Sequence, residues 1–409
     1  MAVRSPCPDI NIPKVSFPDL ILNKIKRFPG KIAFIDDATG RTMTFGEFYK
    51  DVHKLARSLH SIGLEKNDAV VLFLPNIMEY AVIMYGVLLA GGTIEIFTVR
   101  GKIDGIRSYG DLLKLGCDHE LPKISVVPEE DAAFLIYTSG STGERKATIH
   151  THYSTVASIL QICSPMVTPY TGNDVTFVHR SVTHGYGLIF YFTAGLYSGC
   201  TSVFLDDYGT ESLLKAIEKY KVTLLAFTPL DIALLCKYPD ACRYDVSSIK
   251  TVLCSGAPLS NDLLEKFKTV YKIEDVRDTF GMTELFFVLT SQVNKPHMGV
   301  GIPLPNIEFK IAPREVEDVI QALPGVESVV VIGIPHEDYN EIPKAFVVKQ
   351  PGSSITEEDI TRIVEESLDI HRRLKGGVEF LEKLPKTDTG KVLRRLVKEN
   401  VLAKLKNSN

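Results

Sequence analysis

The strongest constraint on the fold is an alternation of apolar and amphipathic segments between Val175 and about Leu289. Three short apolar stretches are each followed by a segment whose apolar residues recur at helical spacing. Strands that alternate with helices favour parallel sheets, because a chain that returns to the same edge needs a crossover. The pattern therefore predicts an α/β fold for the larger part of the chain. The three pairs are 202–205 with 211–220, 223–228 with 230–238, and 251–255 with 261–270.

The segment before this alternation predicts further helices and strands. Thr44 can cap a helix over 44–62, because Glu47 follows three residues later and apolar residues then recur at helical spacing. Residues 99–121 have too weak a pattern to assign. The other elements expected here are a strand over 69–74, a buried helix over 77–89 and a strand over 93–98.

The pattern changes near residue 312, where strand and helix signals no longer alternate regularly. About one hundred residues of this kind form a compact α+β domain. We therefore predict two domains, a large N-terminal domain of mixed and parallel sheets over 1–311 and a small α+β domain over 312–409. The elements expected in the second domain are helices over 314–323, 356–368 and from 390 onward, and strands over 326–334, 344–349 and 378–381.

Composition and charge argue against several classes of function. The chain has 409 residues and a net charge of −4, so no overall basic field points to nucleic acid. No apolar run is long enough to cross a membrane, and the N-terminus lacks the pattern of a signal peptide. Seven scattered cysteines have no metal-ligand spacing, and the last three residues are not a peroxisomal signal. We expect a cytoplasmic protein without a transmembrane segment.

One loop has the composition of a phosphate site. The segment 137–146, with the sequence YTSGSTGERK, follows the apolar run 132–136. Its glycines let backbone N–H groups turn toward an anion, its hydroxyls add donors, and Lys146 adds a positive charge. A Walker loop is excluded, because that motif needs Gly-Lys followed by Ser or Thr, and here Lys146 lies between Arg145 and Ala147. The loop indicates a phosphate cradle, and the alternative is a flexible surface loop rich in Ser and Gly.

Several further motifs occur in order around this loop and together span residues 43–395. With them the sequence resembles the adenylate-forming (AMP-binding) superfamily, and its C-terminal part most resembles the luciferase and coumarate–CoA ligase branch. The motifs are 43–48 (MTFGEF), 184–187 (HGYG), 255–259 (SGAPL), 280–284 (FGMTE), 299–303 (GVGIP), 373–378 (RLKGGV) and 385–391 (PKTDTGK).

The resemblance implies a reaction in two steps. A carboxylate attacks the α-phosphate of Mg-ATP to give an acyl-adenylate and pyrophosphate, and a thiol, usually coenzyme A, then displaces AMP. The implied partners are an aryl or fatty carboxylic acid, ATP, Mg²⁺ and coenzyme A. Phosphoryl chemistry depends on alignment and on neutralisation of charge, which explains the hydroxyls, lysines and carboxylate in the motifs.

The resemblance also implies roles for residues around the nucleotide. Glu284 would bind magnesium together with Thr142, Thr283 would donate to the α-phosphate, and Lys146 would contact the β- and γ-phosphates. Phe280 would stack on adenine. The alternatives are a solvated Lys146, a core Phe280 and an exposed Glu284 at the start of a helix. The other residues implied at the nucleotide and acyl site are Thr138, Ser139, Gly140, Ser141, Gly143, Ser255, Gly256, Ala257, Pro258, Gly281 and Met282.

Further positions concern the acid and the thiol. Lys391 would contact the attacking carboxylate and the α-phosphate, where negative charge accumulates in the transition state. His184 would lie near the acyl carboxylate as a positioning or gating residue. The pair Gly376 and Gly377 would let the backbone approach the pantetheine arm of coenzyme A. The alternatives are that Lys391 is one more cation in a basic run and that His184 is a structural hydrogen-bonding residue.

The sequence departs from the superfamily at two places. A helix and strands are missing where Phe97 passes within a few residues into Lys102, and a longer segment is missing between Ile311 and Ala312. The second gap removes a Thr-Gly-Asp motif, whose aspartate binds the ribose hydroxyls in the family, and the hinge between the domains. Three functions remain open: an acid–CoA ligase, a catalytically impaired or non-catalytic nucleotide- or acyl-binding relative, and a luciferase-like oxygenase that acts on an adenylate.

Overall fold

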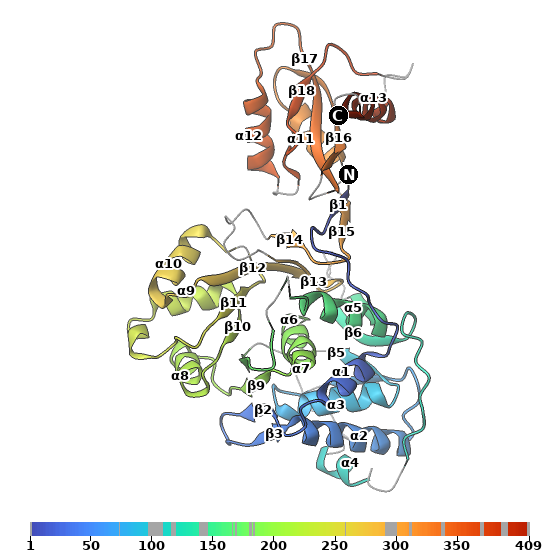
Figure 1. The fold of residues 1–409 in the computed structure, drawn as a ribbon, viewed down its shortest axis with the longest axis vertical. Helices are drawn as coiled ribbons and strands as arrows, with labels where there is room; N and C mark the ends of the chain where they lie inside the picture. The colour runs from blue at the N-terminus through green and yellow to red at the C-terminus, as the bar shows by residue number, and fades with distance from the viewer. Residues whose placement is uncertain are drawn as a thin grey trace. The chain divides into compact units, whose positions relative to one another are not determined.

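The chain folds into two compact units. One unit is Ile10–Pro296, and the other joins Met1–Asp9 to His297–Asn409 (Figure 1). The compact units thus divide between Pro296 and His297, and the independent domains 1–311 and 312–409 stay a prediction. The computed structural model describes residues 2–72, 74–96, 109–115, 120–138, 146–165, 167, 170–179, 182, 185–257, 259–290, 301–310, 313–336, 340–368, 372–385 and 392–406.

The strands that the sequence predicts to alternate with helices form one sheet of the larger unit. Strands β10, β11 and β12 are parallel, and β13 pairs with β12 in the antiparallel sense. The α/β class predicted from the sequence is confirmed. The elements are β10 (Leu224–Phe227), β11 (Thr251–Cys254), β12 (Asp275–Met282) and β13 (Phe286–Thr290), with helices α8 (Thr210–Tyr220), α9 (Pro229–Lys237) and α10 (Asn261–Tyr271).

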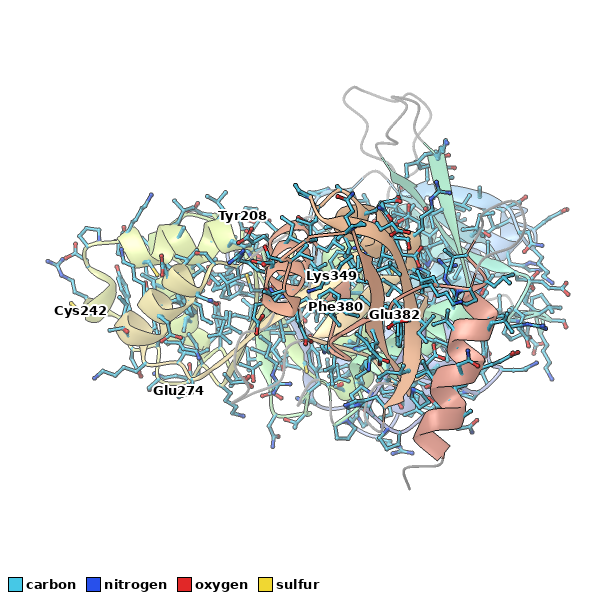
Figure 2. All side chains as sticks on the ribbon, turned by 90° about the horizontal axis from the view of Figure 1, so that it is seen from above. Tyr208, Cys242, Glu274, Lys349, Phe380 and Glu382 are labelled. Atoms are coloured by element: carbon cyan, nitrogen blue, oxygen red, sulfur yellow. The ribbon has the colours of Figure 1, made fainter. Side chains whose placement is uncertain are left out.

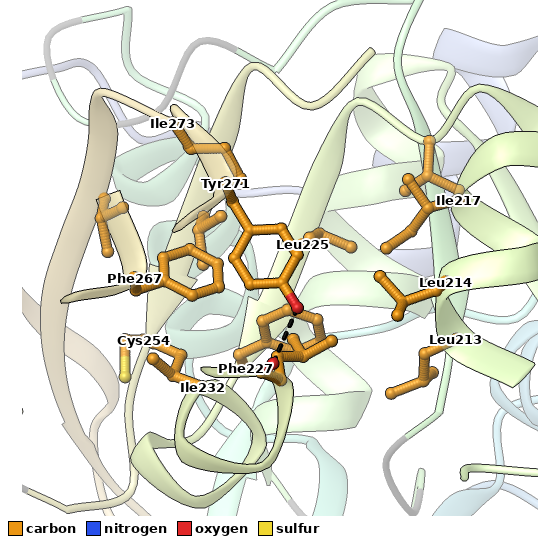
Figure 3. Packing of buried hydrophobic residues seen from close by; sticks show 14 of the residues in the cluster. Leu213, Leu214, Ile217, Leu225, Phe227, Ile232, Cys254, Phe267, Tyr271 and Ile273 are labelled. Atoms are coloured by element: carbon orange, nitrogen blue, oxygen red, sulfur yellow. Dashed lines mark hydrogen bonds between the residues drawn. The ribbon is translucent and has the colours of Figure 1, made fainter. Parts of the chain in front are cut away.

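The core of this region lies between the three helices and the strands. Phe267 and Tyr271 of α10 point toward Leu225 and Phe227 of β10 (Figure 3). The Tyr271 hydroxyl donates to the carbonyl of Leu235 at 2.8 Å, so this buried polar group is satisfied. Burial of each large apolar side chain stabilises the fold by about 1.5–3 kcal/mol.

Two further sheets complete the larger unit. In one, the order is β3-β2-β9-β8, and in the other it is β4-β5-β6-β7. The last pair of the second sheet, β6 with β7, is antiparallel. The strands are β2 (Ile32–Asp36), β3 (Thr42–Thr44), β8 (Val175–Val178), β9 (Thr201–Phe204), β4 (Ala69–Leu72), β5 (Thr93–Ile96), β6 (Ala132–Thr138) and β7 (Lys146–Thr151).

In the larger unit, the helices agree with the sequence predictions where the sequence has a clear cap or apolar period. Thr44 and Glu47 form a reciprocal capping box at the start of α2, as the sequence predicts. The unassigned stretch contains α4, a helix of seven residues that is too short to give a clear apolar period. The remaining helices are α1 (Phe17–Ile25), α2 (Phe45–Ser61), α3 (Met78–Leu89), α4 (Tyr109–Leu115), α5 (His152–Ile162), α6 (Gly185–Gly187), the π-helix η1 (Leu188–Gly195), α7 (Leu196–Ser198) and the short 3₁₀-helix η2 (Ala241–Arg243).

The smaller unit is built on one mixed sheet with the strand order β15-β1-β17-β16, and β18 also pairs with β17. Lys349 of β17 lies over the ring of Phe380 of β18 at 3.9 Å, and Figure 2 labels both residues. The participation of β1 was not predicted from the sequence. The elements are β1 (Ala2–Arg4), β14 (Ile302–Pro303), β15 (Glu308–Lys310), α11 (Pro313–Gln321), β16 (Val326–His336), β17 (Asn340–Lys349), α12 (Glu357–Ser367), β18 (Val378–Phe380) and α13 (Arg394–Lys406).

Within the described residues, no helix combines the length and the apolar character that crossing a bilayer requires.

Candidate active site

The predicted phosphate loop connects two paired strands. Thr138 at the end of β6 pairs with Lys146 at the start of β7, so the antiparallel hairpin fixes both ends of the loop. Lys146 is exposed. The loop residues Ser139, Gly140, Ser141, Thr142 and Gly143 lie outside the described residues, and their roles stay a prediction. The strand β7 was not recognised in the sequence.

A buried histidine ties this hairpin to the predicted magnesium turn. Lys146 and His150 lie on the same face of β7, because residues two and four apart share a face of a strand. His150 is 2% exposed, and its Nε2 lies 2.7 Å from the carbonyl oxygen of Thr283. Burial lowers the pKa of His150, so the neutral ring donates from Nε2 to this carbonyl. The hydrogen bond holds Thr283 on the face of β7 that carries Lys146.

The magnesium turn is the connection of a hairpin and not the start of a helix. Residues 283–285 join β12 to β13, and the N–H of Leu285 donates to the carbonyl of Met282 at 3.1 Å. Glu284 is exposed at this turn. An exposed carboxylate beside a phosphate site fits Mg²⁺, which takes one or two carboxylates and completes its shell with phosphates and water. Among the described residues there is no group of three or more His, Cys, Asp or Glu that could hold a metal ion.

The predicted adenine residues gather at the carboxyl ends of the parallel strands, where ligands of open α/β sheets usually bind. Ser255 follows β11 directly, and its N–H donates to the carbonyl of Phe227 at 3.0 Å. Gly256 has a φ of +91°, which explains why glycine stands there. Phe280 is 42% exposed, so it is not a core residue and can receive a planar ring. Ala257 is exposed, whereas Pro258 lies outside the described residues.

A buried carboxylate beside this loop was missed in the sequence. Asp278 is 5% exposed and accepts a hydrogen bond from the N–H of Thr279 at 3.0 Å. Burial raises its pKa to about 6, and hydrogen bonding by the backbone of Thr279 and Leu259 opposes this rise. Asp278 therefore links β12 to the end of the 255–259 loop. β12 also carries Asp275, Arg277 and Thr279, so no local sequence pattern marked Asp278 as a buried residue.

The predicted aromatic–glycine segment meets the same turn. A Cβ placed on Gly185 would lie 3.7 Å from the ring of Phe286, so α6 lies against that ring. The ring of His150 stacks on Phe286 with a centroid separation of 3.8 Å. The aromatic–glycine segment and the buried His150 therefore meet at Phe286, directly after the magnesium turn. His184 itself lies outside the described residues, and its role stays a prediction.

In the smaller unit, the glycine pair has a structural explanation. A Cβ on Gly376 would lie 2.9 Å from the Cβ of Lys344 and 3.0 Å from the carbonyl of Pro343, so β17 leaves no room for a side chain. Gly377 has a φ of +76°. The approach of pantetheine to Gly376 and Gly377 stays a prediction.

The predicted catalytic lysine, Lys391, lies outside the described residues. The basic helix α13 that follows it makes ion pairs within the smaller unit. Arg394 contacts Glu317 at 2.6 Å, and Lys398 contacts Glu341 at 2.5 Å. These cations of the basic run therefore have structural partners.

Comparison with protein families identifies both parts of the chain. Residues 22–96 and 95–333 match the family described as AMP-binding enzyme, and residues 315–391 match the AMP-binding enzyme C-terminal domain. The first match is broken at 95–96, close to the first predicted gap. The break supports a segment missing at that place.

A plant protein is similar to this chain along nearly its whole length. The 4-coumarate–CoA ligase-like 1 protein of Arabidopsis thaliana is 24% identical, over 98% of this chain and 97% of that protein. That alignment has 527 positions against 409 residues here, so the plant protein carries internal segments that this chain lacks.

Two crystal structures share the fold. ATP-bound MatB from Rhodopseudomonas palustris has a TM-score of 0.62 at 18% identity, covering 94% of this chain and 99% of that one. The anthranilate CoA ligase AuaEII in complex with anthranoyl-AMP has a TM-score of 0.64 at 17% identity, covering 96% and 98%.

Proposed function

The chain belongs to the AMP-binding enzyme family, and from this premise we propose that it is an ATP-dependent acid–thiol ligase that makes an acyl-CoA through an acyl-adenylate. One observation carries the proposal: the 2.7 Å hydrogen bond from His150 to the carbonyl of Thr283. It holds the turn with Glu284 against the strand that begins at Lys146. Four strand residues span about 13 Å, so both charged groups can face one bound nucleotide.

In this proposal the residues neutralise and align the polyphosphate. Lys146 and the hydroxyls of the loop bind the β- and γ-phosphates, and Thr283 donates to the α-phosphate. Glu284, with Thr142, binds Mg²⁺, which supplies positive charge to the phosphate oxygens when it is bound. Lys391 neutralises the charge that develops between the carboxylate and the α-phosphate. Phe280 stacks on adenine.

The proposed substrates are ATP, coenzyme A and an aryl or fatty carboxylic acid. The names of similar proteins support an aryl acid and coenzyme A, since they include a 4-coumarate–CoA ligase-like protein and an anthranilate CoA ligase. We also propose a reducing compartment, the cytoplasm. The six cysteines within the described residues carry free thiols, which supports this location.

A second candidate is a relative that binds nucleotide or acyl groups without turnover. The missing ribose aspartate favours it, because two charge-assisted hydrogen bonds contribute roughly 3–6 kcal/mol in total. Their loss would weaken ATP binding by about two orders of magnitude or more. A luciferase-like oxygenase is a third candidate, and light output or oxygen uptake would identify it.

Release of AMP that depends on both an acid and coenzyme A separates these candidates. The purified chain is incubated with Mg-ATP, coenzyme A and a panel of aryl and fatty acids, and AMP is quantified. The ligase predicts AMP with at least one acid and much less from Lys391→Ala. A folded protein that binds nucleotide but releases no AMP with any acid would support the non-catalytic relative instead.

A further inference from the structure

His150 belongs to none of the motifs that define the nucleotide site, yet it contacts both sides of the magnesium turn. Its Nε2 lies 2.7 Å from the carbonyl of Thr283, the first residue of the turn. Its ring stacks on Phe286, the residue that follows the turn, at 3.8 Å and an interplanar angle of 25°. A single buried side chain thus contacts the backbone before Glu284 and the Phe286 ring after it.

The backbone of Phe286 shows why this turn needs external support. Its φ is +54°, a left-handed conformation that is disfavoured for a bulky L-residue and that persists only when surrounding contacts impose it. The ring is 6% exposed, and it lies against His150 and Gly185. These contacts compensate for a conformation that the local sequence opposes.

The two residues between the contacts are exposed to solvent. Glu284 is exposed, and Leu285 is 51% exposed. Packing of their own side chains therefore contributes little to the position of the turn. The hydrogen bond to Thr283 and the stacked ring of Phe286, together with the Leu285–Met282 hydrogen bond of the turn itself, therefore position the backbone that carries Glu284.

We infer that His150 is a positioning residue, which acts through the Thr283 carbonyl and the Phe286 ring to pre-orient Glu284 toward the Mg²⁺ of bound ATP. This inference rests on the proposed function, since it deepens the role of the same site. Without His150, the turn samples other orientations, and binding of Mg-ATP must then order it. The affinity for Mg-ATP therefore falls.

Four variants test this inference. His150→Leu removes the donor and the aromatic ring at similar volume, whereas His150→Gln restores an N–H donor. Phe286→Leu removes the stacking partner and serves if the first variant does not fold. Tyr271→Phe is the matched control, because it removes a buried 2.8 Å hydrogen bond to a carbonyl in the core around α10.

Two measurements are made on each full-length variant: amide hydrogen exchange of peptides covering 282–290, and the Kd of Mg-ATP by titration calorimetry. We expect His150→Leu and Phe286→Leu to accelerate exchange in these peptides and to weaken Mg-ATP binding about tenfold. His150→Gln, which restores the donor but not the stacked ring, should recover part of the affinity, and Tyr271→Phe should change neither readout.

The outcomes separate this inference from the proposed function. Unchanged exchange and affinity in His150→Leu overturn the inference. Loss of affinity in Tyr271→Phe equal to that in His150→Leu also overturns it, since the effect would then be general destabilisation. The wild-type protein could bind no Mg-ATP while His150→Leu still accelerates exchange in peptides 282–290. That result would support the role of His150 in holding the turn and would count against the proposed function.

Discussion

Phe280 is much more exposed to solvent than the residues that precede it on β12. Residues 276–279 are buried, whereas Phe280 is 42% exposed at the end of the strand where the adenine site is predicted. We expect Phe280→Ala to weaken ATP binding about fivefold, because a stacked aromatic pair contributes about 1 kcal/mol. Titration calorimetry with Phe280→Tyr as the control measures this. An unchanged Kd in Phe280→Ala would remove Phe280 from the adenine site.

A substitution at Glu284 tests whether this residue binds the Mg²⁺ ion. Glu284→Gln keeps the shape of the side chain and removes its charge, so it should raise the Mg²⁺ concentration needed for half-maximal ATP binding about tenfold. Glu274, labelled in Figure 2, is an exposed acid just before β12, and Glu274→Gln is the matched control. An equal shift in both variants would mean that the effect is one of net charge and not of a metal ligand.

His152 makes the stability of the larger unit dependent on pH. It is 2% exposed, its Nδ1 accepts from the N–H of Phe17 at 3.1 Å, and burial lowers its pKa to about 4. The unfolded chain therefore binds a proton between pH 6.5 and 4 that the folded chain does not. Stability from this group is complete above pH 6.5 and declines by about 3 kcal/mol as the pH falls to 4.

The variant His152→Asn checks this pH dependence. An Asn oxygen can accept the same hydrogen bond but does not titrate, so the decline between pH 6.5 and 4 should become shallower. Chemical denaturation followed by circular dichroism at several pH values measures it. Identical slopes in the wild type and the variant would show that other groups control acid unfolding.

One capping box chosen from each unit can test whether the two units unfold separately. Glu47 accepts from the N–H of Thr44 at 2.7 Å, and Asp359 accepts from the N–H of Thr356 at 3.1 Å. Replacing either threonine with alanine should cost about 1 kcal/mol. Thr44→Ala should lower hydrogen-exchange protection in α2, and Thr356→Ala should lower it in α12. Equal loss of protection in both units from either variant would contradict two separate folding units.

The elements with clear periodicity or caps could be predicted from sequence, and those that depend on tertiary contacts could not. The capping residue of α2 and the strand–helix pairs through α10 agree with the structure, because local patterns determine them. Strand β7 was missed because buried His150 lies between Ile149, which is 64% exposed, and partly buried Thr151. Strand β1 was missed because its pairing partner, Glu308–Lys310, is distant in the sequence.

The same distinction applies to the candidate site, where the sequence predicted some residues and missed others. Motifs identified Phe280, Thr283 and Glu284, but not the contacts that hold them. His150 and Asp278 act through hydrogen bonds to backbone groups far along the chain, which no local pattern reports. The positive φ of Phe286 is equally invisible, because a bulky residue is not expected in that conformation.

At the scale of the whole molecule, the chain keeps the family's phosphate motifs while lacking internal segments that a similar plant protein carries. The resemblance predicts that the ribose aspartate and the hinge are among the missing parts. A ligase with these gaps should bind ATP weakly, so saturation should need millimolar nucleotide, about a hundredfold more than an enzyme that saturates near 10 μM. In the proposed mechanism the chemical step depends on Lys146, Glu284 and Lys391, and the sequence retains all three.

The most direct test of the account is acid-dependent exchange of labelled pyrophosphate into ATP, because it reports adenylate formation without requiring coenzyme A. At millimolar Mg-ATP, we predict exchange above background with at least one aryl or fatty acid, and a steep loss in Lys391→Ala. A folded, ATP-binding protein that shows no exchange with any acid, or an exchange that Lys391→Ala leaves intact, would contradict it.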